Sequence, residues 1–529
     1  MLDRILAHFR QPKAEAVKTT QRVSRPLRAS YDSAARTVEN FRHWSWVDFQ
    51  APDASLDPEV RKIIRARARY ELQENNCYGR GLVETMVTDT IGTGPRIQIS
   101  QFNQTDNQNI ERAFHGWARA IGLSEKLDTM RTAKLVDGES ISRFITNINV
   151  DDPVSLDMQL IECDQLSSPS FESIITDTYV DGVVLDRFGN PIAYDILRHH
   201  PGANTWVSDN FAFDRYPYAQ IIHIFNVNRP GQHRGVSEFA PALPLFAFLR
   251  RFTLATVAAA ETAASVAQVI TTDAPIPEEL EDEFAATTFD KFMEAIPIDR
   301  NSATVLPNMW KLQQFAAEHP TTTYQMFKHE IVAEIARTIG MPVNIALANS
   351  GDSNYSSARF DHLGYERIIK KEQDYVSRAV LDRVFAEWLV EASLTGVLPG
   401  RIRDKVLLYN DRFGKRGLAN NIEHAWHWDG LRDADQQNAA QAERLKMQNG
   451  TTHRARAYAE QGLDVEVEDM KAAASLGMDV AKYREWVAAS IFTNGNIIGQ
   501  EPGENQSGKS NGKAAQGNKE ASKTETAKA

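Results

Sequence analysis

The chain has 529 residues, of which 42% are hydrophobic and 24% charged, as in an ordinary soluble protein of two to four domains. Its formal net charge of -11 excludes a protein that holds nucleic acid through a general excess of positive charge, although DNA could still pass by it. Two cysteines exclude a disulfide framework, and the absence of a long uninterrupted apolar run predicts no membrane contact.

Residues 1–30 carry more basic than acidic side chains. The basic residues are Arg4, Arg10, Lys13, Lys18, Arg22, Arg25 and Arg28. Such a run is typical of a flexible, solvated arm, and a contact to DNA or to an acidic partner is the alternative.

Residues 57–236 alternate between helical and extended patterns. Pro58 suits the first position of a helix over residues 58–75, and a second helix ends at the glycines of 92–94. Residues 96–100 alternate as a strand does, 182–197 give a hairpin signal, and 221–227 form another strand. We therefore expect an α+β block here.

A helical pattern then runs without a break over about 33 residues, 237–269, which corresponds to about 50 Å. Alanine dominates its second half, between Ala255 and Ala267. Small side chains let neighbouring helices approach closely, so this face suits packing on copies of itself in a ring. The alternative is a central core helix of one large domain.

The segment that follows, 273–294, is strongly acidic. Its acidic residues are Asp273, Glu278, Glu279, Glu281, Asp282, Glu283, Asp290 and Glu294. Such charge runs are commonly solvated surfaces, and the alternative is a docking surface for a partner protein.

A second helix is expected over 322–340, where Gly340 and Pro342 end it. The loop after it is polar and has one acidic and no basic residue: Asn349, Ser350, Gly351, Asp352, Ser353, Asn354, Tyr355, Ser356 and Ser357. It is either a plain connector to a helix starting near Ala358, or a mobile tip that faces something sliding past. The second interpretation fits DNA, because each phosphate neutralised by a cation would add affinity and friction.

The C-terminal part contains four short helical patterns, at 434–447, 452–461, 465–476 and 480–489. From residue 501 to its end the chain has no large apolar side chain and is expected to be disordered.

We find no catalytic motif. Residues 503–510 match the P-loop expression, but neither a strand before them nor a helix after them is indicated, and both are needed to hold phosphates. The histidine pairs His424/His427 and His199/His200 lack a clear third metal ligand and fit ordinary packing. We therefore predict no enzyme, no cofactor and no metal.

Several segments, in this order, resemble the lambda-type portal, or head–tail connector, proteins of tailed bacteriophages. They are 65–67 through 75–78 to 91–94, then 161–166, 182–186 with 189–194, 228–232 with 235–237, 335–342 and 354–359. Their order and spacing together carry the resemblance, which extends over about residues 30–490.

The resemblance implies an α+β portal fold assembled as a ring, with an α/β wing, a long-helix stem, a small α/β clip and a helical C-terminal crown. By position, 1–30 is the basic arm, 31–236 the wing, 237–270 the first stem helix, and 271–318 the clip. The second stem helix is 319–348, the tunnel loop 349–357, the wing return 358–430, the crown 431–492, and the disordered tail 493–529.

The implied function is a channel at one capsid vertex, usually of twelve copies, through which double-stranded DNA is packaged by the terminase and later ejected. Capsid, scaffold and head-completion proteins are further implied partners, with assembly in the host cytoplasm. The clip residues expected to dock the terminase or an adaptor are Glu278, Glu279, Glu281, Asp282 and Glu283. The alternatives are a structural or adaptor protein without a channel, and a packaging ATPase suggested only by residues 503–510.

Overall fold

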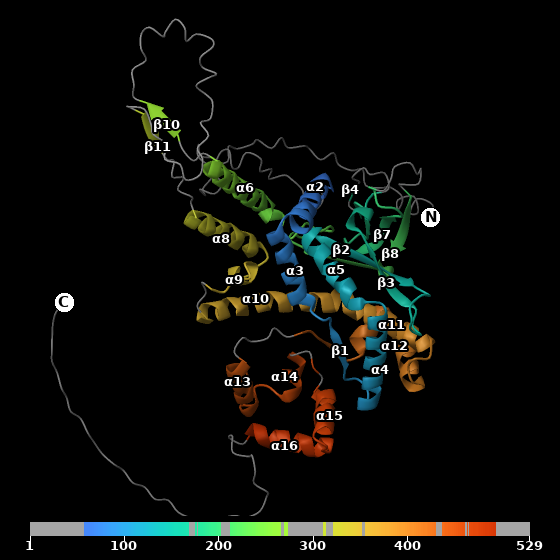
Figure 1. Cartoon of the computed structure of the whole chain (residues 1–529). Helices are drawn as coiled ribbons and strands as arrows, with labels where there is room; N and C mark the ends of the chain where they lie inside the picture. Colours follow the sequence, from blue (N-terminus) through green and yellow to red (C-terminus); the bar gives the residue numbers. More distant parts are fainter. Residues whose placement is uncertain are drawn as a thin grey trace, which may run out of the picture. The chain divides into compact units, whose positions relative to one another are not determined.

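The computed structural model describes most of the chain between residues 58 and 492 (Figure 1). The described residues are 58–168, 175–176, 178–202, 212–265, 269–272, 310–313, 321–351, 355–429, 436–460, 463 and 465–492. The basic arm, most of the clip, the tail and the P-loop-like residues 503–510 lie outside them.

The described chain begins with helices α2 (Pro58–Arg69) and α3 (Cys77–Ile91), joined by a π-helical turn, η3 (Tyr70–Asn75). Asn76 ends the π turn and caps α3, because its side chain accepts hydrogen bonds from the N–H groups of Tyr78 and Gly79 at 3.0 and 3.2 Å. The two helices expected before Gly92 are therefore present. Gly92, which ends α3, has φ +57, a conformation that glycine adopts readily.

Two antiparallel sheets form the β part of this region. One has the order β3-β2-β9, from Leu156–Ile161, Glu139–Thr146 and Ile221–Phe225. The other has the order β4-β5-β6-β7-β8, from Ile175–Thr176, Tyr179–Val180, Val183–Leu185, Pro191–Leu197 and Phe213–Pro217. The expected hairpin is β6–β7, and Asp186 forms its turn by accepting hydrogen bonds from the N–H groups of Phe188 and Asn190, both at 2.8 Å.

Strand β1 (Arg96–Ile99) pairs with a strand from the far end of the wing return, β12 (His424–His427). The sequence pattern predicted β1 but not β12. The pair lies beside helices α4 (Gln104–Ala120) and α11 (Asp382–Leu394), which contribute the largest aromatic cluster. In it, Phe114 lies 5.2 Å from Trp388 and 5.4 Å from Trp117 between ring centroids. This core therefore joins segments that are about 300 residues apart.

The long helix is shorter than its sequence pattern predicts. A 3-10 turn, η6 (Ala240–Ala242), precedes α6 (Leu243–Ser265), which has 23 residues or about 35 Å. Pro241 and Pro244 explain the late start, since proline lacks the N–H that an earlier helix would need. At the other end Val269–Thr272 is strand β10, paired with β11 (Trp310–Gln313), in keeping with its β-branched residues.

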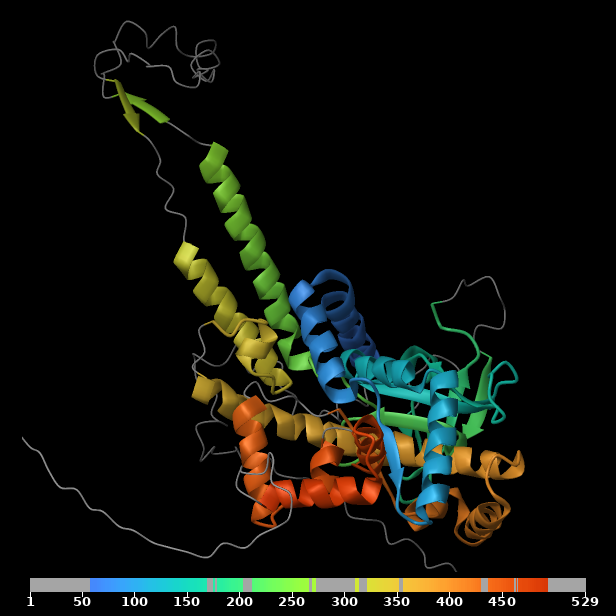
Figure 2. The same cartoon turned by 60° about the horizontal axis from the view of Figure 1, so that its bottom comes forward.

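Helix α8 (Thr321–Thr338) follows the expected bounds of the second stem helix and lies beside α6 in both views (Figures 1 and 2). The segment Ala240–Glu261 is also long and apolar enough, by length and composition, to cross a membrane. A single such helix is weak evidence for a membrane, because helices of soluble proteins meet the same test.

Two further helical stretches complete the described chain. After α9 (Val343–Ala346), helix α10 (Tyr355–Val376) continues through a π-helical turn, η8 (Ser377–Leu381), into α11, and α12 (Gly400–Asn421) packs on α11. The four C-terminal helices agree with expectation: α13 (Gln436–Gln448), α14 (Arg454–Glu460), α15 (Val465–Ser475) and α16 (Val480–Phe492). A second core joins α3 and α5 (Leu123–Val136) to α6, α8 and α10.

The aromatic cluster offers a matched test of packing. Trp117 and Trp388 are both fully buried, but the indole N–H of Trp117 donates to the carbonyl of Leu156 at 2.9 Å, whereas that of Trp388 has no partner in the described part of the chain. We expect Trp117→Phe to lower the free energy of unfolding by about 1–3 kcal/mol more than Trp388→Phe, because it leaves a buried carbonyl unpaired. Urea unfolding of both variants measures this, and equal losses would contradict it.

Candidate functional site: the stem root and the loop-bearing helix

The structure describes only part of the predicted site. Asn349, Ser350 and Gly351 are exposed, and the side chain of Asn349 accepts a hydrogen bond from the N–H of Gly351 at 2.9 Å. Residues 352–354 lie outside the description. The last residues of the expected loop, 355–357, already belong to α10, so the loop is shorter than predicted. Glu278, Glu279, Glu281, Asp282 and Glu283 of the expected clip also lie outside it.

The far part of α6 has little apolar packing. Phe252 stacks on Tyr324 of α8 at 5.7 Å and contacts Phe327 at 4.1 Å, both between ring centroids. From Arg250 to Glu261, however, no side chain of α6 is buried, and Leu254 and Val257 are 62% and 50% exposed. Other exposed apolar residues on the neighbouring helices are Met326, Phe360 and Leu363. In the single chain, these helices therefore present an uncovered apolar surface.

The loop-bearing helix α10 is anchored to α3 along its buried side. The hydroxyl of Tyr365 donates to the carboxylate of Asp89 at 2.9 Å, and the amide of Gln373 donates to the carbonyl of Thr90 at 3.0 Å. Burial, and then the Asp89 carboxylate, raise the pKa of Tyr365 well above its usual value. The side of α10 toward α3 is thus fixed, while its first turns expose Phe360 and Leu363.

Helix α5 carries two buried cations that meet both the stem root and α10. We call the stem root residues 235–242, the turn and 3-10 segment that lead into α6. Arg131 donates from Nη1 and Nη2 to the two carboxylate oxygens of Glu238 at 2.7 and 3.3 Å. Lys134 donates to Glu372 of α10 at 2.5 Å. Two positive and two negative groups from three elements therefore form one ion group, the α5 junction.

The pKa directions agree with this arrangement. Burial by itself would raise the pKa of Glu238, but Arg131, Lys134 and a hydrogen bond from Asn226 hold it below its usual value. Burial lowers the pKa of Lys134, because removal from water disfavours the charged ammonium, and Glu372 opposes that effect.

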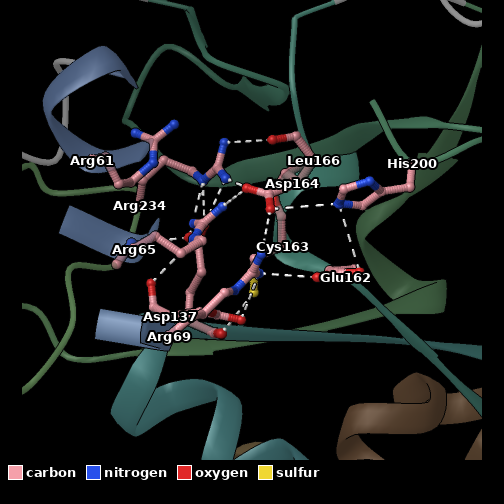
Figure 3. Close-up of polar contacts among 12 residues, drawn as sticks. Arg61, Arg65, Arg69, Asp137, Glu162, Cys163, Asp164, Leu166, His200 and Arg234 are labelled. Atoms are coloured by element: carbon pink, nitrogen blue, oxygen red, sulfur yellow. Dashed lines mark hydrogen bonds and ion pairs between the residues drawn. The ribbon is translucent and has the colours of Figure 1, made fainter. Parts of the chain in front are cut away.

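A larger ion cluster lies next to the stem root and joins α2, residues 137–139, residues 162–166, Asp181, His200 and Arg234 (Figure 3). Three arginines, one turn apart on α2, point into it: Arg61, Arg65 and Arg69. Arg65 donates to Asp164 at 2.5 Å and to Glu139 at 2.7 Å, and Arg69 donates to Asp137 at 2.6 Å. Helix α2 therefore docks through charged side chains, and its apolar Val60 and Ile63 are exposed.

The centre of this cluster is the pair of Arg234 and Glu139, both fully buried. Arg234 donates to Glu139 at 2.6 and 3.0 Å, to the carbonyl of Leu166 at 2.9 Å and to the carbonyl of Asp181 at 2.5 Å. Burial by itself would raise the pKa of Glu139, but Arg234, His223 and Arg65 together hold it well below its usual value. Since each charge has a partner, the cluster holds these segments in one arrangement.

One corner of the cluster, Glu162, Asp164 and His200, brings three possible metal-ligand atoms within 4.8 Å of one another. Its carboxylates, however, already bind Arg65 and Arg69. Nδ1 of His200 accepts a hydrogen bond from the N–H of Gly202, so the proton of a neutral ring lies on Nε2, the atom that faces the carboxylates. The geometry thus fits an ion-pair corner better than a metal site.

The histidines set aside from the sequence have protein partners. Nε2 of His424 lies 3.2 Å from Asp382, and Nε2 of His427 lies 2.8 Å from the side-chain oxygen of Gln98. The sequence reasoning missed both the α5 junction and the arginine cluster. The spacing of Arg61, Arg65 and Arg69 by four residues was the available signal, but alone it suggests a solvated helix face.

The described fold joins two sheets to the long helices α6 and α8 and to the loop-bearing helix α10. Comparison of the sequence with known families identifies the class of protein that has this chain. The family described as "Phage portal protein, lambda family" matches residues 40–373. This is more than half of the chain, and the chain therefore belongs to that family. The resemblance inferred from the short segments is confirmed. The matched family is not described as a family of enzymes.

Individual relatives are more distant. The "Probable portal protein" of Halomonas phage phiHAP-1 is 26% identical over 273 residues, which are 51% of this chain and 52% of that protein. The match thus spans about half the length of this curated relative. Among solved structures, a chain in the neck of an empty gene transfer agent particle, computed with C6 symmetry, shares 13% identity at a TM-score of 0.39, over 78% of this chain and 94% of that one. A chain in the neck of the native particle, computed with C12 symmetry, shares 14% identity at a TM-score of 0.37, again over 78% of this chain and 94% of that one. TM-scores this low carry no further conclusion.

The buried cluster predicts acid sensitivity with a defined sign. Glu139, Asp164, Asp181 and Glu238 have folded-state pKa values below the usual 4.5 for Glu or 3.8 for Asp, so they stabilise the fold above about pH 4.5 and lose that contribution as pH falls further. The pKa of the buried His223 is lowered from 6.5, so stability also begins to fall below about pH 6.5.

Urea unfolding between about pH 7.5 and about pH 2.5 measures this dependence. The expected control is Glu84→Gln, which removes an exposed pair with Arg80 and should leave the pH profile unchanged. A free energy of unfolding that stays constant over this whole range would show that the buried ion pairs are not a major stabilising element.

Proposed function

We propose that this chain is the portal subunit of a tailed-phage particle. In this proposal, a ring of copies, usually twelve, forms a channel at one capsid vertex and joins head to tail. Double-stranded DNA enters through it under the action of the terminase and leaves through it later. The observation that carries the proposal, beyond family membership, is the uncovered apolar surface of α6, α8 and α10.

A ring explains that surface because each copy covers the exposed face of the next. Leu254 and Val257 lie among alanines on α6, so a neighbouring helix can approach closely there. Burying one such side chain stabilises by about 1.5–3 kcal/mol, and a closed ring repeats this at every interface. A soluble monomer would leave the same residues in water.

The loop at 349–357 is proposed to face the DNA. Asn349, Ser350 and Gly351 are exposed and uncharged, which suits contact without strong phosphate binding. The acidic segment with Glu278, Glu279, Glu281, Asp282 and Glu283 is proposed as the surface that meets the terminase and, later, head-completion proteins. A virion location, with assembly in the host cytoplasm, belongs to the same proposal.

The ring is tested by light scattering and negative-stain microscopy of the purified protein. We expect rings with an axial hole for the natural chain and a shift to monomers for Leu254→Asp/Val257→Asp, because two carboxylates would be buried at each interface. The control is Ile148→Asp, which changes an 86% exposed residue between β2 and β3 and should leave rings unchanged. Intact rings in the double variant would contradict the stem interface.

The loop is tested by deletion of residues 351–354. We expect rings of normal mass but a clear loss of DNA packaged or retained in particles, measured as nuclease-protected DNA, because the polar tip no longer reaches the channel. Normal packaging by this variant would refute the role of the loop.

A further inference from the structure

The α5 junction links two elements that have different proposed tasks. Glu238 lies in the stem root, and Glu372 lies in α10, which begins at Tyr355, directly after residues 349–354. Their cation partners, Arg131 and Lys134, are separated by a single turn of α5 and are almost fully buried. The two carboxylates are thus held by one helix, although 134 residues separate them in the sequence.

Arg131 is placed to serve both carboxylates. Its Nη1 lies 2.7 Å from Oε1 of Glu238 and 3.6 Å from Oε1 of Glu372. Its Nε has no hydrogen-bond partner among the described residues. A shift of less than an ångström of the Glu372 carboxylate toward Arg131 would therefore bring Nη1 from ion-pair range into hydrogen-bond range of Glu372, in competition with Glu238.

The neighbours of the junction leave little freedom for independent movement. The ammonium of Lys134 also lies 4.4 Å from the ring centroid of Tyr375, and the amide of Asn226 donates to Glu238 at 2.9 Å. The hydroxyl of Ser237 and the backbone N–H of Glu238 both donate to the carbonyl of Leu135, at 3.0 and 3.1 Å, and these bonds further hold the stem root to α5. A buried charge without a partner is strongly unfavourable, so displacement of one carboxylate must redistribute the others.

We infer that Arg131 and Lys134 are positioning residues that couple the loop-bearing helix to the stem, so that a displacement of α10 at the loop is transmitted to the root of α6. The inference rests on the proposed function in one respect, because the DNA that would displace the loop belongs to that proposal. The coupling itself is a property of the single chain and needs neither DNA nor a ring.

Hydrogen exchange of the full-length protein, read by mass spectrometry, tests it. Glu372→Gln removes the charge of that side chain on α10. Peptides are followed over residues 235–249, which cover the stem root and the start of α6, and over residues 357–372 of α10. We expect exchange to accelerate by about tenfold or more in both regions, although the substitution lies in only one. Because coupling between two sites is reciprocal, Glu238→Gln should accelerate exchange at 357–372 in turn.

The matched control is Lys126→Met on the same helix. Lys126 pairs with Asp157 of β3, and among the described residues no hydrogen bond or ion pair joins it to the stem root or to α10, so its loss should accelerate exchange only near α5 and β3. If Glu372→Gln fails to fold, Lys134→Met/Glu372→Met removes both members of the pair and leaves no uncompensated charge, and the same acceleration at 235–249 is expected.

Acceleration confined to α10 in the Glu372 variants, with the stem root unchanged, would overturn the inference. So would an equal response of the stem root to Lys126→Met, because the effect would then be general loosening of α5. Either result leaves the ring test of the stem untouched, and failure of that ring test would leave this exchange result standing.

Discussion

The fully buried pair of Arg234 and Glu139 is the interaction on which the described architecture depends. Glu139 opens β2, and Arg234 lies three residues before Ser237, where the stem root meets α5. Through its five N–H groups Arg234 reaches Glu139, Asp181 and the carbonyls of two loops, so it ties both sheets to the start of the stem. The direction in which α6 leaves the wing is therefore set by ion pairing as well as by apolar packing.

The close approach of the stem root to the start of β2 also requires two glycines. Gly138 has φ +89, and a Cβ there would lie 2.2 Å from the carbonyl carbon of Val236. A Cβ on Gly235 would lie 2.1 Å from the carbonyl oxygen of Gly138. The two backbones thus touch where α5 turns into β2, which brings the α5 junction and the Arg234 cluster to opposite sides of the same few residues. Charge pairing and close backbone approach together make the root of the stem rigid.

The sequence predicted those elements whose signals are local. Pro58, Gly92 and the glycine turn at 189 mark the ends of elements, and the C-terminal helices agree within a few residues, because caps and turns depend on neighbouring residues. The predicted long helix was too long at both ends. At its start the helical periodicity continues across Pro241, and at its end residues 269–272 form a strand only because they pair with residues 310–313. Strand β12 and the buried ion clusters could not be predicted, since their partners lie 36 (His200–Asp164) to 331 (Arg96–His427) residues away in the chain. The family resemblance was available from ordered short segments. The acidic residues expected to form the docking surface and loop residues 352–354 lie outside the described residues, so their roles rest on the sequence alone.

Polar and apolar side chains are arranged differently at the stem root and farther along α6, and in the proposed ring this would combine a rigid root with adaptable contacts between subunits. At the root, the charged groups Arg131, Lys134, Arg234 and Glu139 are inside, and each ion group is close to balanced. Farther along α6 the order is reversed, because apolar Leu254 and Val257 are outside and nothing from Arg250 to Glu261 is buried within the chain. Ion pairs and hydrogen bonds are directional, and they fix the angle of the helix before any neighbour arrives. Apolar contact is not directional, and it lets adjacent copies adjust their separation without breaking a specific bond. In the ring proposed above, the specific interactions would therefore lie within each subunit and the adaptable apolar contacts between subunits.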